Sequence, residues 1–242
     1  MTGQQSRREI PPALSHDDVW FDIVVIGASA GGVHALELLL RALPEPFPIP
    51  VAIVLHLSPD HVSVLPQVLT RTTGRPVEWA TDGAPLVAGP ILAAPPGRHL
   101  EVDDRGSVVL ATTPPVHFSR PSVDRLFSSA ARVFAHRALA VILTGNGSDG
   151  AEGALAVCDA GGVVIAQDEA SSEYFNMPRE VISAGAATVV LPLDSIAVAI
   201  TRLVRDGRGV LAELGPTPNG ERTARLRRAG ESPLAEPRSP GS

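Results

Sequence analysis

Three polar side chains stand at the ends of apolar runs in this sequence. Ser29 follows one run in IGASAGG, His56 ends a second in IVLHLSP, and Asp149 follows a third in LTGNGSDGA. Nucleophilic acyl transfer needs a hydroxyl that attacks, an imidazole that takes its proton, and a carboxylate that orients the imidazole. We therefore expect Ser29 to be a nucleophile, with His56 as its base and Asp149 as the orienting acid.

The glycine-rich turn around Ser29 predicts a site for the negative charge that such an attack creates. A helix is expected to begin near Gly31, and the amides at a helix N-terminus carry partial positive charge. The backbone N–H of Ala30 is the candidate donor to the oxyanion. Asn146 and Gly147 precede Asp149 and are expected to lie in the same pocket, where the side-chain amide of Asn146 offers a further donor.

The elements that must position these residues alternate between strand and helix patterns. Apolar, β-branched runs predict strands at 21–27, 50–56, 138–145, 162–167 and 186–192. Helical recurrence predicts helices at 33–43, 62–71, 122–135, 149–160, 178–184 and 194–204. The alternation predicts an α/β fold with a doubly wound, mostly parallel sheet flanked by helices. Residues 89–95 and the two runs around 103–106 predict a small β-hairpin insertion.

Composition predicts one folded domain between two loose ends. Residues 1–20 are polar and contain a Pro-Pro pair, so we expect a flexible lead-in. Residues 21–205 contain the alternating elements and are expected to form the catalytic domain. From 206 to 242 the chain is rich in Gly, Pro, Arg and Glu and lacks an apolar period, which predicts a disordered tail.

The composition also excludes several functions. The net charge of −6 argues against nucleic-acid binding, and the absence of lysine excludes a P-loop, a Schiff base and a Ser-Lys dyad. One cysteine allows no disulfide framework, and no apolar stretch is long enough to insert into a membrane, so a cytoplasmic protein is expected. The remaining histidines, His117 among them, have no metal-like spacing to carboxylates, and we expect neither a metal nor a cofactor.

A simpler interpretation exists for each of the three residues. GASAGG after a first strand could be a dinucleotide-binding turn, although it departs from GxGxxG and His56 stands where a ribose-binding acid is expected. His56 could be a packing residue, and Asp149 could be only a helix N-cap. The occurrence of all three at strand ends favours the nucleophilic site.

Six blocks of the sequence together resemble a known family. They are VVIGASAGGVHAL, VLHLSPDH, ILAAPPGRHLEV, RPSVDRLFSSAA, ILTGNGSDGAEGALAVCDAGG and AQDEASSEYFNMPREVI. In this order, from about Asp22 to Val204, they resemble the catalytic domain of the CheB protein-glutamate methylesterases of bacterial chemotaxis. The resemblance implies a serine hydrolase that removes methyl esters from glutamates on the cytoplasmic helices of chemoreceptors, or on a related signalling protein of a similar chemosensory pathway, and that in many members also deamidates receptor glutamines. By position it assigns nucleophile, base and acid to Ser29, His56 and Asp149.

The sequence departs from that family in three ways. About twenty residues precede the first catalytic strand, so we expect a stand-alone form without the N-terminal receiver domain and without control by phosphorylation in cis. Asn146 stands where the family's loop has methionine, and Ala30 where many members have threonine. Met177, in the family's MP pair, is expected to line the crevice. An alternative function is a catalytically silent binding or scaffold module of the same fold.

Overall fold

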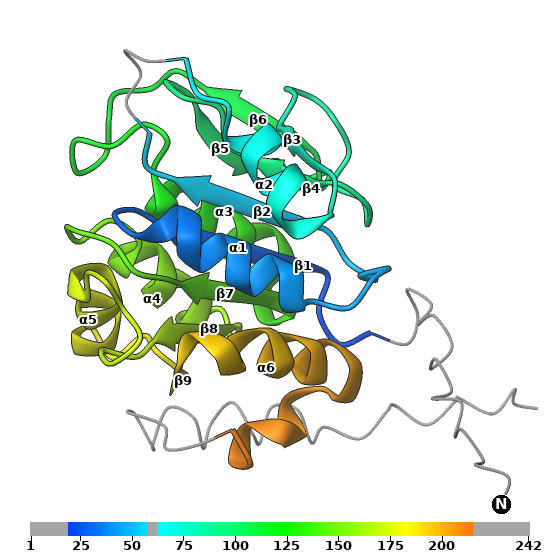
Figure 1. Ribbon diagram of the computed structural model, residues 1–242, viewed down its shortest axis with the longest axis vertical. Coiled ribbons are helices and arrows are strands. Elements are labelled where there is room, and N and C mark those ends of the chain that lie inside the picture. The colour runs from blue at the N-terminus through cyan, green and yellow to red at the C-terminus, as the bar shows by residue number, and fades with distance from the viewer. Residues whose placement is uncertain (1–18, 58–61, 215–242) are drawn as a thin grey trace, which may run out of the picture.

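A seven-stranded sheet forms the centre of the computed structural model, which describes residues 19–57 and 62–214 (Figure 1). Its strand order is β3-β4-β2-β1-β7-β8-β9, and every neighbouring pair is parallel. The strands are β1 (Ile23–Ala28), β2 (Val51–Leu55), β3 (Val77–Trp79), β4 (Ile91–Ala93), β7 (Ala138–Ile142), β8 (Val163–Gln167) and β9 (Val189–Leu191). The expected doubly wound α/β fold is confirmed.

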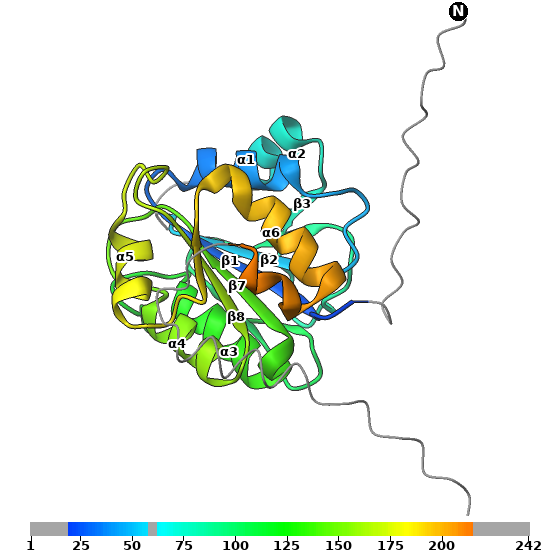
Figure 2. The same cartoon turned by 90° about the horizontal axis from the view of Figure 1, so that it is seen from below.

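Six α-helices cover the two faces of this sheet. Figure 2 shows α1 (Gly32–Ala42), α2 (Leu65–Thr73) and α6 (Leu193–Asp206) on one face, and α3 (Val123–Phe134), α4 (Ala151–Asp159) and α5 (Asn176–Ser183) on the other. The central strands are apolar and buried on both sides, as parallel strands between helices must be. Side chains of β1 alternate between the two resulting cores, with Val24 and Ile26 in one and Ile23 and Val25 in the other.

The expected hairpin insertion is present, but one segment assigned to it belongs elsewhere. Strands β5 (His99–Val102) and β6 (Val108–Ala111) form a separate antiparallel pair packed against α3. The run at 89–95 instead contributes β4 to the main sheet, between β2 and β3. Strand β3 was not expected from the sequence, because its three residues are too few to show a period.

The boundaries of the folded part also differ from those expected. Helix α6 continues to Asp206, and a 3₁₀ helix at Arg208–Ala212 buries Val210 and Leu211, so the predicted tail cannot begin before residue 215. At the other end, Val19 is buried and the amide of Trp20 bonds the carbonyl of Val204. The rest of the expected lead-in and tail, 1–18 and 215–242, lies outside the described residues.

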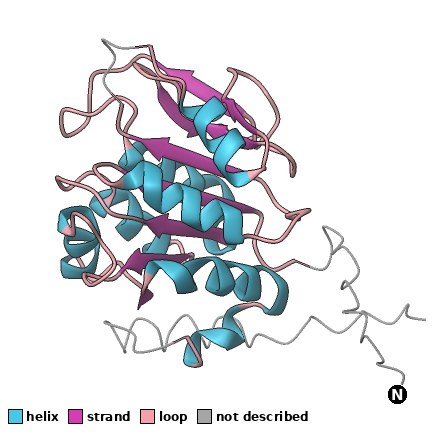
Figure 3. Ribbon diagram, viewed as in Figure 1, coloured by secondary structure: helices cyan, strands magenta, loops and turns pink. Residues whose placement is uncertain are grey.

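The parallel strands place their carboxyl ends at one edge. Figure 3 shows their arrowheads pointing to the same side of the molecule, where the connecting loops gather. In an open α/β sheet, ligands bind at this edge, next to the strand where the chain order reverses. That strand is β1, whose neighbours β2 and β7 lie on opposite sides of it. None of the helices in the described part is long and apolar enough to cross a bilayer.

Helices α3 and α4 pack so closely that a side chain at Gly153 would have no room. A Cβ there would lie 2.7 Å from the Cβ of Phe127 and 2.9 Å from the backbone of Asp124. We predict that Gly153→Ala lowers the free energy of unfolding by about 1–3 kcal/mol, because the backbone of α3 must move to admit the methyl group. Urea denaturation measures this loss.

Gly209→Ala is the matched control, since a Cβ at that position meets no atom within 4 Å. Equal stability of the two variants would contradict the close packing of α3 on α4.

Candidate active site

The register of the sheet brings two of the predicted residues to neighbouring strand ends. In the β1–β2 pair, Ala28 stands opposite Leu55, so Ser29 and His56 are the next residue on each strand. The His56 amide donates to the carbonyl of Ala28 at 3.2 Å. On the other side of β1, the Ser29 amide donates to the carbonyl of Thr144 at 3.0 Å, just beyond β7. Ser29 therefore lies between the strand that carries His56 and the loop that leads to Asp149.

Asp149 and His56 are joined directly. The Nε2 of His56 lies 2.6 Å from Oδ2 of Asp149, and the exposed fractions of the two side chains are 16% and 2%. Three further donors hold the same carboxylate: the Ser122 hydroxyl at 2.7 Å and the amides of Val123 and Asp124 at 2.7 and 3.0 Å. Both carboxylate oxygens are thus satisfied in a buried position, which fixes the acid in place.

Asp149 precedes α4 in the chain but caps the N-terminus of α3. The N-cap of α4 is Gly150, whereas the carboxylate of Asp149 accepts hydrogen bonds from the first two amides of α3. An anion at a helix N-terminus is stabilised by the unpaired amides and by the helix dipole. The interpretation of Asp149 as a mere cap of its own helix is therefore wrong.

The hydrogen bonds of Asp149 determine its charge and the tautomer of His56. Burial raises the pKa of Asp149, but the hydrogen bonds from His56, the Asp124 amide and the Ser122 hydroxyl outweigh it and hold the pKa below its usual range. An ionised carboxylate can only accept, so Nε2 of His56 is the donor in this pair. In the neutral imidazole, Nδ1 is then the nitrogen that can accept a proton.

A second set of hydrogen bonds fixes the turn that carries Ser29. The hydroxyl of Thr144 donates to the carbonyl of Ala30 at 3.0 Å, and the amide of Thr144 donates to the Gln167 side chain at 2.8 Å. A Cβ at Gly145 would lie 2.8 Å from the Cβ of Ser29 and would collide with Met177. Only glycine lets this loop approach Ser29 so closely.

The other predicted pocket residues surround this turn in different ways. Ala30 is half-buried next to Gly31, whose φ of 75° leads into α1. Asn146 is exposed, and its side-chain Oδ1 accepts a hydrogen bond from the Asn176 side-chain amide at 3.2 Å. Gly147 has a φ of 94°. Met177 is fully buried behind Gly145, so it supports the loop from the core side and does not line an open crevice.

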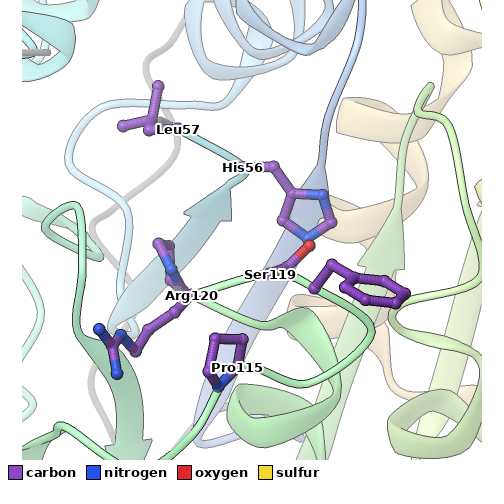
Figure 4. Close-up of a pocket in the computed structure, with 7 residues that line it drawn as sticks. His56, Leu57, Pro115, Ser119 and Arg120 are labelled. Atoms are coloured by element: carbon purple, nitrogen blue, oxygen red, sulfur yellow. The ribbon is translucent and has the colours of Figure 1, made fainter. Parts of the chain in front are cut away.

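A cavity of about 290 Å³ opens at His56 (Figure 4). Its other walls come from the residue after His56 and from the loop before α3, namely Leu57, Pro115, Phe118, Ser119, Arg120 and Pro121. The guanidinium of Arg120 donates to the carbonyls of Thr112 and Thr113 at 3.2 and 3.1 Å, so Arg120 organises its own loop. The cavity therefore opens onto His56, whereas Ser29 is not among its lining residues.

Several residues that organise the site were not found from the sequence. Ser122 showed only as a helix entry signal, and Thr144 and Gln167 gave no signal, because their partners are distant along the chain.

Asp124 was also missed. Burial and the neighbouring charge of Asp149 raise the pKa of Asp124 to about 6, despite a hydrogen bond from the Gly153 amide. Three consecutive residues of the block RPSVD donate hydrogen bonds to Asp149. A sequence signal for them is the Ser at the start of a predicted helix, because the free amides there need an acceptor such as a carboxylate.

Comparison with known proteins agrees with this architecture. The profile described as CheB methylesterase matches residues 24–200. The chain belongs to the CheB methylesterase family. The crystal structure of the Thermotoga maritima CheB methylesterase catalytic domain superposes with a TM-score of 0.73 at 36% identity, covering 76% of this chain and 99% of that one.

Curated relatives carry the name protein-glutamate methylesterase/protein-glutamine glutaminase. One from Anaeromyxobacter dehalogenans is 44% identical over 85% of this chain and 59% of its own length. Another, from Nitrosospira multiformis, is 42% identical over 76% of this chain and 52% of its own length. The chain thus spans between half and three fifths of the length of these relatives.

Ser122 provides a test of how Asp149 is held. We predict that Ser122→Ala lowers the free energy of unfolding by about 1–2 kcal/mol, because a buried carboxylate oxygen loses a hydrogen bond and α3 loses its N-cap acceptor. Chemical denaturation measures the loss. The partly exposed Ser195 on α6 is the matched control, and a Ser195→Ala variant should stay within about 0.5 kcal/mol of wild type. An unchanged Ser122→Ala protein would contradict a structural role for this hydroxyl.

Proposed function

We propose that this chain is a serine esterase that hydrolyses methyl esters of glutamate side chains on chemoreceptor helices in the cytoplasm. The observation that carries the proposal is the 2.6 Å hydrogen bond between His56 and Asp149, one strand end away from Ser29. Membership of the CheB methylesterase family and the names of its curated relatives support a glutamate methyl ester as the substrate.

The first half of the reaction forms an acyl-enzyme. Nδ1 of His56 accepts the proton of the Ser29 hydroxyl while Oγ attacks the ester carbonyl carbon. The negative charge that develops on the carbonyl oxygen is met by the Ala30 amide and by the positive end of α1. Asp149 stabilises the imidazolium, which then returns its proton to the methoxy oxygen, so that methanol leaves and the glutamyl group remains on Ser29.

Hydrolysis of the acyl-enzyme uses the same groups. Nδ1 of His56 takes a proton from water, the hydroxide attacks the acyl carbon, and the imidazolium protonates Oγ of Ser29 as the receptor leaves with a glutamate carboxylate. A glutamine side chain would follow the same course, with the protonated amine leaving as ammonia. The relatives' second name, protein-glutamine glutaminase, supports this second substrate for the same site.

Replacement of the nucleophile tests the proposal directly. Ser29→Ala is expected to lower the kcat for methanol release from a methylated receptor by about 10⁴-fold or more, because no acyl-enzyme can form. Methanol is measured with radiolabelled methyl groups on the receptor.

Ser119 is the control that makes this test specific, since it is a serine that lines the cavity at His56 (Figure 4). A serine-reactive fluorophosphonate should label wild type and Ser119→Ala but not Ser29→Ala. Labelling of Ser29→Ala together with loss of labelling in Ser119→Ala would move the nucleophile to Ser119. No labelling of any protein would favour a silent scaffold module.

A strained turn presents an aromatic ring at the rim of the cavity. Val116 and Ser119 bond each other through both backbone groups, at 3.1 and 2.8 Å, and the two residues between them have φ of 47° and 63°. These are His117 and Phe118, and left-handed backbone costs about 1–2 kcal/mol for each such residue. The side chain of Phe118 is fully exposed. The strained backbone holds the apolar ring of Phe118 in solvent beside the cavity. This arrangement favours docking of Phe118 against the apolar face of a receptor helix.

We therefore predict that Phe118→Ala raises the KM for methylated receptor about tenfold or more, the loss expected when one buried aromatic contact is removed. Hydrolysis of a small ester such as p-nitrophenyl acetate should change far less, because a small ester covers little of a fully exposed ring. Val198→Ala, which removes an exposed apolar side chain from α6, is the control. Equal KM values for receptor in the two variants would exclude Phe118 from docking.

A further inference from the structure

Three potential metal ligands from distant parts of the chain meet beside the catalytic site. His117 comes from the strained turn before α3, Asp124 from the first turn of α3, and Glu152 from the first turn of α4. One nitrogen and two carboxylate oxygens from these residues lie within 4.8 Å of one another. The turn and the packing of α3 on α4 create this proximity, which the spacing of His117 along the chain does not predict.

One oxygen in the cluster is buried without a hydrogen bond. Oδ1 of Asp124 accepts from the Gly153 amide at 2.7 Å, whereas Oδ2 has no hydrogen-bond partner among the described residues. Nε2 of His117 is 3.5 Å from this oxygen, beyond ordinary hydrogen-bond length. The Asp124 side chain is only 6% exposed, so solvent does not compensate. A buried carboxylate oxygen in this position needs a partner.

The spacing of these atoms suits a cation between them. Zn²⁺ binds histidine nitrogen and carboxylate oxygen at about 2.0–2.2 Å in tetrahedral geometry, which places adjacent ligand atoms about 3.3–3.6 Å apart. The separation of 3.5 Å between His117 and Asp124 falls in this range. Glu152 is exposed, and its side chain can rotate to bring a carboxylate oxygen to ligand distance from the same ion. Imidazole with carboxylates is a donor set suited to Zn²⁺ and similar divalent transition ions.

We propose that His117, Asp124 and Glu152 form a binding site for a divalent transition cation, with Zn²⁺ as the best match and water as the fourth ligand. His117 and Glu152 reach solvent and provide the route of entry, and Asp124 supplies the buried anchor. The bound ion ties the turn at the cavity rim to both helices. It also lies next to the Asp124 amide, which donates to Asp149.

Calorimetric titration of the chelator-treated full chain with ZnCl₂ at pH 7 tests the site. Wild type should bind one ion, and His117→Ala and Glu152→Gln should each bind about tenfold or more weakly, at least the loss seen when an outer-shell partner is removed. His136→Ala, which removes an exposed histidine next to β7, should bind as wild type does. Absence of binding by wild type, or equal binding by His117→Ala and His136→Ala, would overturn the proposal.

Two further measurements separate ligand loss from misfolding. His117→Ala should unfold at the temperature of wild type in the presence of chelator, whereas added Zn²⁺ should raise the Tm of wild type and of His136→Ala only. Co²⁺ bound to wild type should give the visible d–d absorption of a tetrahedral site, and His117→Ala should lack it. A Co²⁺ spectrum that is unchanged in His117→Ala would assign the ion to other residues.

Discussion

The site depends on one buried carboxylate and the four groups that donate to it. Asp149 accepts from His56, the Ser122 hydroxyl and the amides of Val123 and Asp124, at distances of 2.6 to 3.0 Å. An unpaired carboxylate buried at this depth would lower the stability of the fold. Because its hydrogen bonds are satisfied, Asp149 keeps its charge and holds the imidazole of His56 in a fixed orientation. Three of the four donors come from the N-cap and first two residues of α3, so the position of a whole helix orients one histidine.

The parallel sheet explains how residues so far apart meet. Strand β1 lies between β2 and β7, and its register brings Ser29, His56 and the Thr144 loop to one edge without any long excursion of the chain. The loop after β7 can then carry Asp149 across to α3 on the face where α3 and α4 pack. Because rigid strands set these positions, the order of the three residues along the chain places no limit on their geometry.

Much of the fold follows from local sequence patterns, and the failures have physical causes. The long apolar strands and the amphipathic helices gave clear periods and were predicted within a few residues. Strand β4 was assigned to the hairpin because its partners, β2 and β3, are chosen by packing that no local pattern records. The 3₁₀ helix at Arg208–Ala212 was interpreted as tail because only Val210 and Leu211 in a glycine- and arginine-rich stretch face the core.

Sequence patterns single out three residues of the candidate site but not the residues that support them. Ser29, His56 and Asp149 stand at strand ends, which a sequence reveals, whereas the contact between Ser122 and Asp149 spans 27 residues and joins two loops. The turn at 116–119 is closed by its own backbone bonds, and none of the four donors to Asp149 comes from it. The fully exposed side chain of Phe118 at its tip can therefore be replaced over evolutionary time at little structural cost. A single codon change at Phe118 can therefore alter the surface beside the cavity, whereas a change at Asp149 or at the start of α3 would remove hydrogen bonds from the buried network.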